Sequence, residues 1–427
     1  MHEIKTALKI LAVCPHICKP DTSAGDLRFV RLLEILTSFA KVELLVPQNR
    51  WRNHQDVHYW NSLEGKGIRI VDPSLWDRFE LLCTAEHYDL ILVEFWHQAE
   101  KLVPLIASLK RTQPNLKLIT DTVDIHFLRE LAEFELNSSD DQSILEGIQT
   151  RMRRELATYS HSDVVIVVTK EDQKALVDKQ CTVPTELVPI IVSTSARSAN
   201  PDPNTILFIG GFKHKPNIDA VLWFVHEIFP RIRSKIPDAI FRVVGSYPTE
   251  QILELNAIPG VEIVGFVKET IDEINRACVS VAPLRFGAGM KGKVIEALSY
   301  GLPVVTTSFG AQGLNATDGK HLRIADEASL FAEYVCECLR NPINANRMGQ
   351  QGQSLIENLC GPESVRISLK KRFEREWDTP ASDTWTPMRQ LAKLRCWAIQ
   401  TRSKLKRFSK NLLSKMLRTR KTVSSTR

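Results

Sequence analysis

Short runs of aliphatic residues alternate with amphipathic helical stretches over most of this chain, and this alternation constrains its fold more than any other feature. Runs that are apolar on both faces and separated by helices are typical of parallel sheets covered by helices on two sides. In the first part of the chain, strands are predicted at Lys9–Val13, Val42–Val46, Ile68–Val71, Leu90–Val93, Leu116–Thr120, Val164–Val168 and Leu187–Ile190. The clearest helix between them is Leu27–Phe39, whose leucines recur at helical spacing.

The alternation stops once and then restarts. Residues 194–205 (TSARSANPDPNT) are rich in proline, serine and asparagine, which is typical of a linker. Beyond it, strands are predicted at Ile206–Ile209, Ile240–Val244, Val261–Val264, Val279–Ala282 and Val304–Thr306, and helices at Asp219–Ile232, Ile271–Asn275, Val294–Tyr300 and Ser329–Leu339. We therefore expect an α/β protein with two doubly wound, Rossmann-like domains, residues 1–195 and 204–377, facing a cleft. Ligands of such sheets bind outside the carboxyl ends of the strands.

The charge of the chain is unevenly distributed. Its net charge is +6, yet no acidic residue follows Asp383, and residues 389–427 hold 13 lysines and arginines. Leu405, Phe408, Leu412 and Met416 recur among them at spacings of three and four. This pattern predicts a basic amphipathic helix over residues 389–421 of a tail that spans 378–427. An anionic membrane surface is the expected partner of this tail, nucleic acid is not expected, and a solvated tail without a partner is the alternative.

Nine scattered cysteines do not form a disulfide framework, and free thiols are typical of a reducing compartment. The first apolar run is short and is followed by proline and charged residues, unlike a signal peptide, and no run approaches the length of a membrane span. We expect a cytoplasmic protein, peripheral at the inner face of the membrane if its tail binds there. Cys14, His16 and Cys18 offer metal ligands, but no second half-site with zinc spacing follows, so no metal or cofactor is expected.

The most informative segment is PLRFGAGMKGKVIEALSYGLPVVTTSFGAQGL, residues 283–314. A predicted strand ends at Ala282, a loop with three glycines follows, and a helix is expected to begin near Met290. Flexible backbone, exposed amides and a helix N-terminus together form an anion site suited to a diphosphate. Lys291 and Lys293 oppose the helix dipole there, and a bound anion would compensate for this.

This segment resembles the nucleotide-sugar site of family 4 glycosyltransferases, which have the GT-B fold. The matching residues are Gly287, Gly289, Lys293, Glu296, Ala297, Gly301, Pro303, Val304, Val305 and Gly313. Three further segments are similar to parts of the family: FIGGFKHKPNIDAVLWF (208–224), DTVDIHFLREL (121–131) and PDTSAGDLRFVRLLEIL (20–36). The resemblance covers roughly residues 8–377.

The resemblance implies roles for donor-binding residues. Glu296 would accept hydrogen bonds from the ribose hydroxyls, since one carboxylate can accept from two neighbouring hydroxyls. Lys293, and either Lys213 or Lys215 after Gly211, would neutralise the leaving diphosphate. The turn at Gly245 and the loop residues Gly287, Ala288 and Gly289 would frame the nucleotide and the sugar, as would Gly25 by letting its loop approach closely.

Two residues after a predicted strand end, Asp124 and His126, would orient the acceptor or the sugar hydroxyls, so the catalytic set is Asp124, His126 and Lys293. One position departs from the family. Where many members carry a second glutamate that contacts the transferred sugar, this chain has Ala288. The identity of the sugar is therefore left open.

The expected function is a metal-independent retaining glycosyltransferase that moves a sugar from a nucleotide-diphosphate sugar to a glycan or lipid-linked acceptor in cell-surface glycan or glycolipid synthesis. Two alternatives stay open. A sugar-nucleotide epimerase on the same fold would turn over its substrate without an acceptor. A catalytically inactive GT-B binding protein, suggested by Ala288, would transfer nothing.

Overall fold

The computed structural model describes residues 8–21, 23–47, 56–136, 141–197, 200–287 and 289–376. The chain divides into two compact units. The first holds residues up to Thr122, Ala157–Val165 and residues from Arg372, and the second holds Val123–Leu156 and Ile166–Lys371. Ala288 and the predicted tail, residues 378–427, lie outside the described residues. The expected domain limits, 1–195 and 204–377, stay a prediction.

The first sheet has seven strands in the order β3-β2-β1-β4-β5-β6-β7. They are β1 (Leu8–Val13), β2 (Ala40–Leu45), β3 (Arg69–Ile70), β4 (Leu90–Glu94), β5 (Lys117–Asp121), β6 (Val164–Val167) and β7 (Thr185–Leu187). Strand β1 pairs in parallel with both β2 and β4, and β4 pairs in parallel with β5. Each strand coincides with a predicted apolar run to within a few residues.

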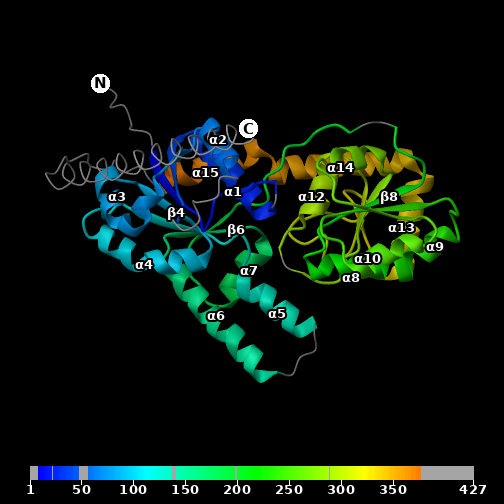
Figure 1. Ribbon diagram of the computed structural model, residues 1–427, viewed down its shortest axis with the longest axis horizontal. Helices are drawn as coiled ribbons and strands as arrows, with labels where there is room; N and C mark the ends of the chain where they lie inside the picture. The colour runs from blue at the N-terminus through cyan, green and yellow to red at the C-terminus, as the bar shows by residue number, and fades with distance from the viewer. Residues whose placement is uncertain are drawn as a thin grey trace, which may run out of the picture. The chain divides into compact units, whose positions relative to one another are not determined.

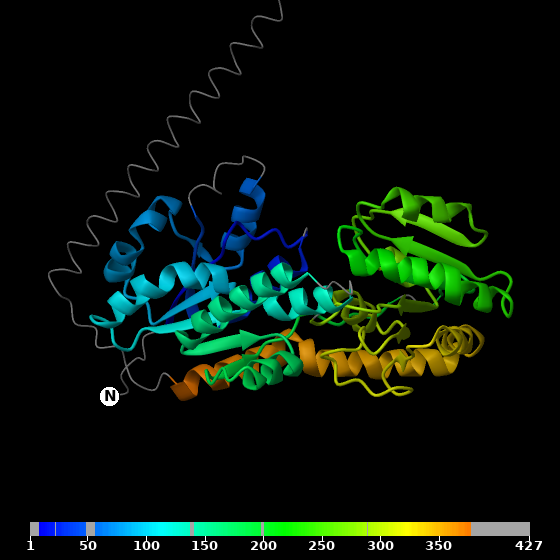
Figure 2. The ribbon, with the colours of Figure 1, turned by 90° about the horizontal axis from the view of Figure 1, so that it is seen from below.

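The helices of this part of the chain follow the strands in sequence (Figure 1). They are α1 (Ala24–Thr37), α2 (Val57–Gly65), η3 (Pro73–Arg78), α3 (Phe79–Glu86), α4 (Trp96–Lys110), α5 (His126–Leu136), α6 (Gln142–Ser160) and α7 (Lys170–Asp178). Helices α5 and α6 lie side by side and are joined by an ion pair of 2.7 Å between Arg151 and Glu130 (Figures 1 and 2).

The second sheet has six strands in the order β10-β9-β8-β11-β12-β13. They are β8 (Thr205–Ile209), β9 (Ile240–Val244), β10 (Val261–Gly265), β11 (Val279–Ala282), β12 (Val304–Thr306) and β13 (Arg323–Ile324). Its helices are α8 (Lys215–Trp223), the π-helix η4 (Phe224–Ile228), α9 (Phe229–Arg233), α10 (Glu250–Glu254), η5 (Leu255–Ala257), α11 (Ile271–Arg276), α12 (Gly292–Ser299), α13 (Ala328–Arg340), α14 (Pro342–Cys360) and α15 (Pro362–Glu376).

Alternating side chains of β8 divide the interior of the second unit into two cores. Ile206 and Phe208 pack against α8, α9 and α13 on one face of the sheet, whereas Leu207 packs against α12 on the other. Successive side chains of a strand point to opposite faces, so a strand that is apolar at every position is buried on both sides. The predicted architecture, two parallel sheets each combined with helices, is confirmed.

One predicted helix is wrong in detail. Residues 219–232 were expected to form a single α-helix, but α8 gives way to a π-helical turn at Phe224–Ile228 before α9 begins. Pro230 lies in the first turn of α9, and the amide of Phe229 donates to the carbonyl of Phe224, five residues back. Proline has no amide hydrogen and its ring clashes with the preceding turn, so a wider turn relieves the conflict.

A buried ion pair closes the carboxyl edge of the first sheet. Arg28 from α1 donates to both carboxylate oxygens of Asp121 at the end of β5, at 2.9 and 2.7 Å. The two side chains are 2% and 0% exposed. Removing one member of such a pair leaves a charge buried without its partner, which costs far more than the pair contributes to stability.

Within the described residues, no helix is both long and apolar enough to cross a bilayer.

We predict that Asp121→Asn lowers the free energy of unfolding by about 3–5 kcal/mol, because Arg28 keeps its charge without the carboxylate. Urea denaturation followed by tryptophan fluorescence measures this loss. The matched control is Glu363→Gln, which removes one partner of the exposed pair with Arg366 and is expected to cost less than about 1 kcal/mol. Equal effects of the two substitutions would contradict the prediction.

Candidate functional site

The site is built at the carboxyl ends of β8, β9 and β11, where three glycine-containing turns come together. The amide of Gly210 donates to the carbonyl of Val244 at 2.8 Å, which brings the turn after β8 against the turn after β9. A methyl group at Gly245 would lie 2.0 Å from the carbonyl oxygen of Gly210, so no larger residue fits. Gly211 and Gly245, both predicted as donor-binding residues, are thus neighbours.

The loop between β11 and α12 is held by a lysine. Lys291 Nζ donates to the carbonyl oxygens of Gly289 at 2.6 Å and Gly287 at 3.3 Å. Both glycines have positive φ angles, +123° at Gly287 and +69° at Gly289, which residues with a side chain rarely adopt. The two predicted loop residues are therefore bound to one cation, and Lys291 acquires a positioning role that the sequence did not indicate.

Helix α12 starts at Gly292, two residues beyond the predicted start at Met290, and carries no acidic residue in its first turn. Its N-cap residue, Lys291, makes no capping hydrogen bond with its side chain. Helices ordinarily satisfy their first amides with such a cap or with a ligand. The N-terminus of α12 therefore keeps the properties of an anion site: backbone amides, a positive dipole end and two lysines.

Lys293 lies in the first turn of α12 and links it to the turn after β8. Its Nζ donates to Asn217 Oδ1, and Asn217 Nδ2 in turn donates to the carbonyl oxygen of Gly211 at 2.6 Å. Asn217 is buried near the start of α8. Sequence reasoning missed Asn217, because an asparagine that follows a proline just before a predicted helix is unremarkable until the fold places it beside Lys293.

The surroundings of Lys291 and Lys293 disfavour the charged form of both side chains. Burial and, to a smaller extent, the nearby charge of Lys291 lower the pKa of Lys293 to about 7. Burial also lowers the pKa of Lys291 to about 8, although Asp172 opposes the shift. A buried lysine that loses its solvent shell without gaining an anion favours the neutral form. An anion bound beside both ammonium groups would supply the missing compensation.

Glu296 lies one turn further along α12. Its Oε1 accepts a hydrogen bond from the hydroxyl of Thr270, the residue before α11. Thr270 thus positions the carboxylate that the sequence assigned to the ribose hydroxyls. Glu296 and Lys293 belong to the same short helix, so the same backbone fixes both side chains relative to the glycine loop.

The two lysines after Gly211 have different surroundings. Lys213 Nζ lies 3.8 Å from the ring centroid of Tyr247, which is exposed beside the turn at Gly245. Lys215 instead forms an exposed ion pair of 2.9 Å with Glu133. A cation on an aromatic face remains available to an anion, whereas the ion pair already occupies Lys215. The geometry therefore favours Lys213 as the companion of Lys293.

The predicted catalytic residues Asp124 and His126 contact each other. His126 Nε2 lies 3.2 Å from Asp124 Oδ1, and Arg129 also contacts Asp124. The buried carboxylate of Glu155 accepts hydrogen bonds from the amides of His126 at 3.0 Å and Phe127 at 3.2 Å. Glu155 therefore caps α5 and fixes the backbone from which His126 projects. The sequence did not single out Glu155.

Gly25 was expected in a loop, but it lies in the first turn of α1, which is capped by Ser23.

Cys14 and Cys18 come together after β1, whereas the imidazole of His16 lies 3.3 Å from Asp26. The residue that joins the two thiols is Glu94, which the sequence did not indicate. A single glutamate at the end of an apolar strand does not by itself indicate a metal ligand.

Residues 203–341, which contain the glycine turns after β8, β9 and β11 and helix α12, match the family described as "Glycosyl transferases group 1". A curated relative, "Uncharacterized 44.6 kDa protein in cps region" of Klebsiella pneumoniae, is 25% identical over 174 residues. That alignment covers 39% of this chain, and the chain spans 45% of the length of the relative.

Solved structures show the same fold over most of the chain. Sucrose-phosphate synthase from Thermosynechococcus elongatus superposes with a TM-score of 0.61 at 14% identity, covering 86% of this chain and 98% of that one. Anabaena HepE in complex with UDP superposes with a TM-score of 0.61 at 14% identity, covering 86% and 100%. The chain therefore has the GT-B fold of these proteins, and its residues 203–341 are similar to the glycosyl transferases of group 1.

We predict that the contribution of Lys293 to the free energy of unfolding of the ligand-free protein becomes more favourable as the pH rises from about 7 toward 10.5. The folded-state pKa of about 7 lies below the ordinary 10.5, so the unfolded chain binds more protons between these values. Lys293→Met should therefore stabilise the protein most at about pH 6.5, and the difference should shrink by about pH 9.5.

Thermal unfolding of wild type and variant at these pH values measures the difference. The control is Lys179→Met, which alters an exposed lysine and should leave a constant difference across the series. A Lys293→Met variant that is less stable than wild type at the lowest pH would refute the account of a desolvated lysine.

Proposed function

We propose that this chain transfers a sugar from a nucleotide-diphosphate sugar to an acceptor hydroxyl with retention of the anomeric configuration, in the synthesis of a cell-surface glycan or glycolipid. UDP is the proposed nucleotide, since HepE was solved with UDP, with UDP and glucose, and with UDP-glucose. The relative in a cps region supports a role in polysaccharide synthesis.

The observation that carries the proposal is the pair of desolvated lysines at the N-terminus of α12. Lys291 binds the glycine loop and Lys293 is held by Asn217, so both ammonium groups are fixed at the start of a helix, whose first amides have no partner within the helix. A diphosphate would neutralise both and would occupy the helix N-terminus. Fixed positive charge is most effective when negative charge develops on a leaving group, which here is the nucleoside diphosphate.

The proposed reaction follows from this arrangement. The bond between the anomeric carbon and the diphosphate oxygen breaks, and Lys293 stabilises the departing charge. The acceptor oxygen attacks from the same face, forms the new bond, and passes its proton to the departing diphosphate oxygen. Glu296 holds the ribose, and Thr270 keeps its carboxylate oriented. Lys213, stacked on Tyr247, would provide a second charge for the diphosphate.

The acceptor side is proposed to include Asp124 and His126, which Glu155 positions through the backbone of α5. An imidazole that accepts or donates a hydrogen bond beside a carboxylate is suited to orienting a hydroxyl. A glycan or lipid-linked acceptor fits this chemistry. Delivery of a lipid-linked acceptor by the basic residues 389–421, and a cytoplasmic location, stay parts of the proposal.

We predict that UDP stands out in a thermal-shift panel with GDP, ADP, CMP and dTDP. A nucleotide at about 100 times its dissociation constant should add about 2.7 kcal/mol to the free energy of unfolding. Lys293→Ala and Glu296→Ala should remove most of the shift, whereas Lys320→Ala, at an exposed lysine, should leave it unchanged. In a transfer assay, Lys293→Ala should lower kcat by about 10²–10³.

The outcomes separate the candidate functions. A shift with UDP and transfer from UDP-sugar to an acceptor support the proposal. Turnover of UDP-sugar with no acceptor present would point to an epimerase. A shift without any turnover would point to a binding protein, and a flat panel would contradict the nucleotide site itself.

A further inference from the structure

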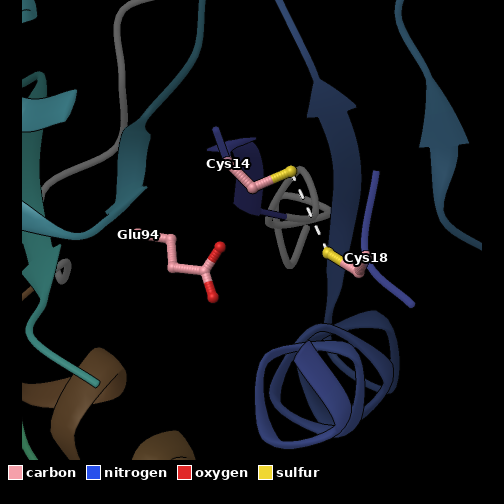
Figure 3. Close-up of side chains that lie close together, drawn as sticks. All are labelled: Cys14, Cys18 and Glu94. Carbon is pink, nitrogen blue, oxygen red and sulfur yellow. Dashed lines mark hydrogen bonds between the residues drawn. The ribbon is translucent and has the colours of Figure 1, made fainter. Parts of the chain in front are cut away.

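Three side chains that the transfer reaction does not use converge at the carboxyl edge of the first sheet. Strands β1 and β4 are parallel neighbours with Val13 opposite Val93, so Cys14 follows β1 where Glu94 ends β4. Cys18 reaches the same place from the segment between β1 and α1. Figure 3 shows both sulfur atoms and the carboxyl group of Glu94 turned toward one space.

The two sulfur atoms of this cluster are spaced as two ligands of one metal ion are. The Sγ atoms of Cys14 and Cys18 are 3.9 Å apart, and one ligand atom from each of the three residues lies within 4.8 Å of the others. Two thiolates at the usual zinc–sulfur distance of about 2.3 Å, in tetrahedral geometry, are separated by about 3.8 Å. The sulfur atoms therefore need to move little to hold one ion.

The burial of the three side chains is a second, independent reason to expect a bound cation. Cys14, Cys18 and Glu94 are 0%, 2% and 1% exposed. The thiol of Cys14 donates to the carbonyl of His16 and that of Cys18 to Cys14 Sγ, but Glu94 Oε1 has no hydrogen-bond partner among the described residues. A buried carboxyl oxygen without a partner is costly and requires an explanation. A cation bound between the three side chains provides it.

The surroundings favour a cation over an anion. Asp26 and Asp121 add negative charge near Glu94, whereas Arg28, which is paired with Asp121, opposes it. Two sulfur ligands exclude the hard cations Ca²⁺ and Mg²⁺, which take oxygen ligands, and thiolates with one carboxylate suit Zn²⁺. The side chain of His16 lies on Asp26 and is not part of this set.

We propose that Cys14, Cys18 and Glu94 form a zinc site, which links the segment between β1 and α1 to the end of β4. Water completes the tetrahedron as the fourth ligand. The two thiols and the carboxyl group give up their protons to solvent as the ion binds, so the cluster exchanges protons for one metal ion. All three residues belong to the first unit, and the ion has no step in the proposed sugar transfer.

The test is a titration of the full-length, fully reduced, chelator-treated protein with Co²⁺, a spectroscopic substitute for Zn²⁺. We expect one equivalent to bind, with a thiolate-to-cobalt charge-transfer band and the visible bands of tetrahedral cobalt, and Zn²⁺ to displace it. Cys14→Ser combined with Cys18→Ser should abolish the charge-transfer band. Glu94→Gln, which preserves the shape of the side chain, should weaken binding by about tenfold or more.

Cys83→Ser is the matched control, since Cys83 is equally buried in the same unit but lies in α3, and its spectrum should equal that of the wild type. Thermal unfolding of each variant establishes that it is folded. If the reduced wild type binds no Co²⁺ with a charge-transfer band, the proposal is wrong regardless of how the variants behave. A band that survives the double substitution would also overturn it.

Discussion

Parallel pairing of the strands determines where the chemistry of this protein lies. In a parallel sheet all carboxyl ends meet at one edge, so residues distant in sequence become neighbours there. In the second sheet this edge gathers the turns at Gly210, Gly245 and Gly287 and the start of α12. In the first sheet the same rule brings Cys14, Glu94 and Asp121 together.

The two edges are stabilised in different ways. The first uses a complete ion pair, in which Arg28 and Asp121 neutralise each other away from water. In the second, Lys291 donates to backbone carbonyls and Lys293 donates to the side-chain amide oxygen of Asn217. Neutral partners leave much of the cost of desolvation uncompensated, which is why burial lowers the pKa of both lysines. Two desolvated lysines destabilise the protein when no anion is bound. A bound anion would remove this cost, so the arrangement is suited to binding one.

Much of the fold could be predicted from the sequence. Most strands correspond to an apolar run, because strands buried on both faces have no polar face to obscure the pattern. Strand β7 is half-buried and shares only Leu187 with the run predicted at Leu187–Ile190. Strand β13 was missed since it comprises only Arg323 and Ile324. The π-helical turn before α9 was missed because its cause, Pro230, disturbs hydrogen bonding without changing the apolar spacing. Boundaries of this kind depend on backbone geometry rather than on residue type.

The site was predicted less completely. Gly287, Lys293 and Glu296 were found because they are close in sequence and belong to one strand–loop–helix unit. Asn217, Thr270 and Glu155 were not, because each acts by positioning a residue that is far away in the chain. Contacts of this type exist only in the folded state. The same reason explains why Glu94 escaped notice while Cys14 and Cys18 were considered as ligands.

We infer that a bound diphosphate restores the charges of Lys291 and Lys293. Calorimetric titration with UDP in buffers of different ionisation enthalpy, at about pH 8, measures the protons taken up on binding. With ligand-free pKa values of about 8 and 7, the wild type should take up on the order of one proton or more per nucleotide, and Lys293→Met should take up fewer. Binding of UDP without proton uptake would contradict the claim.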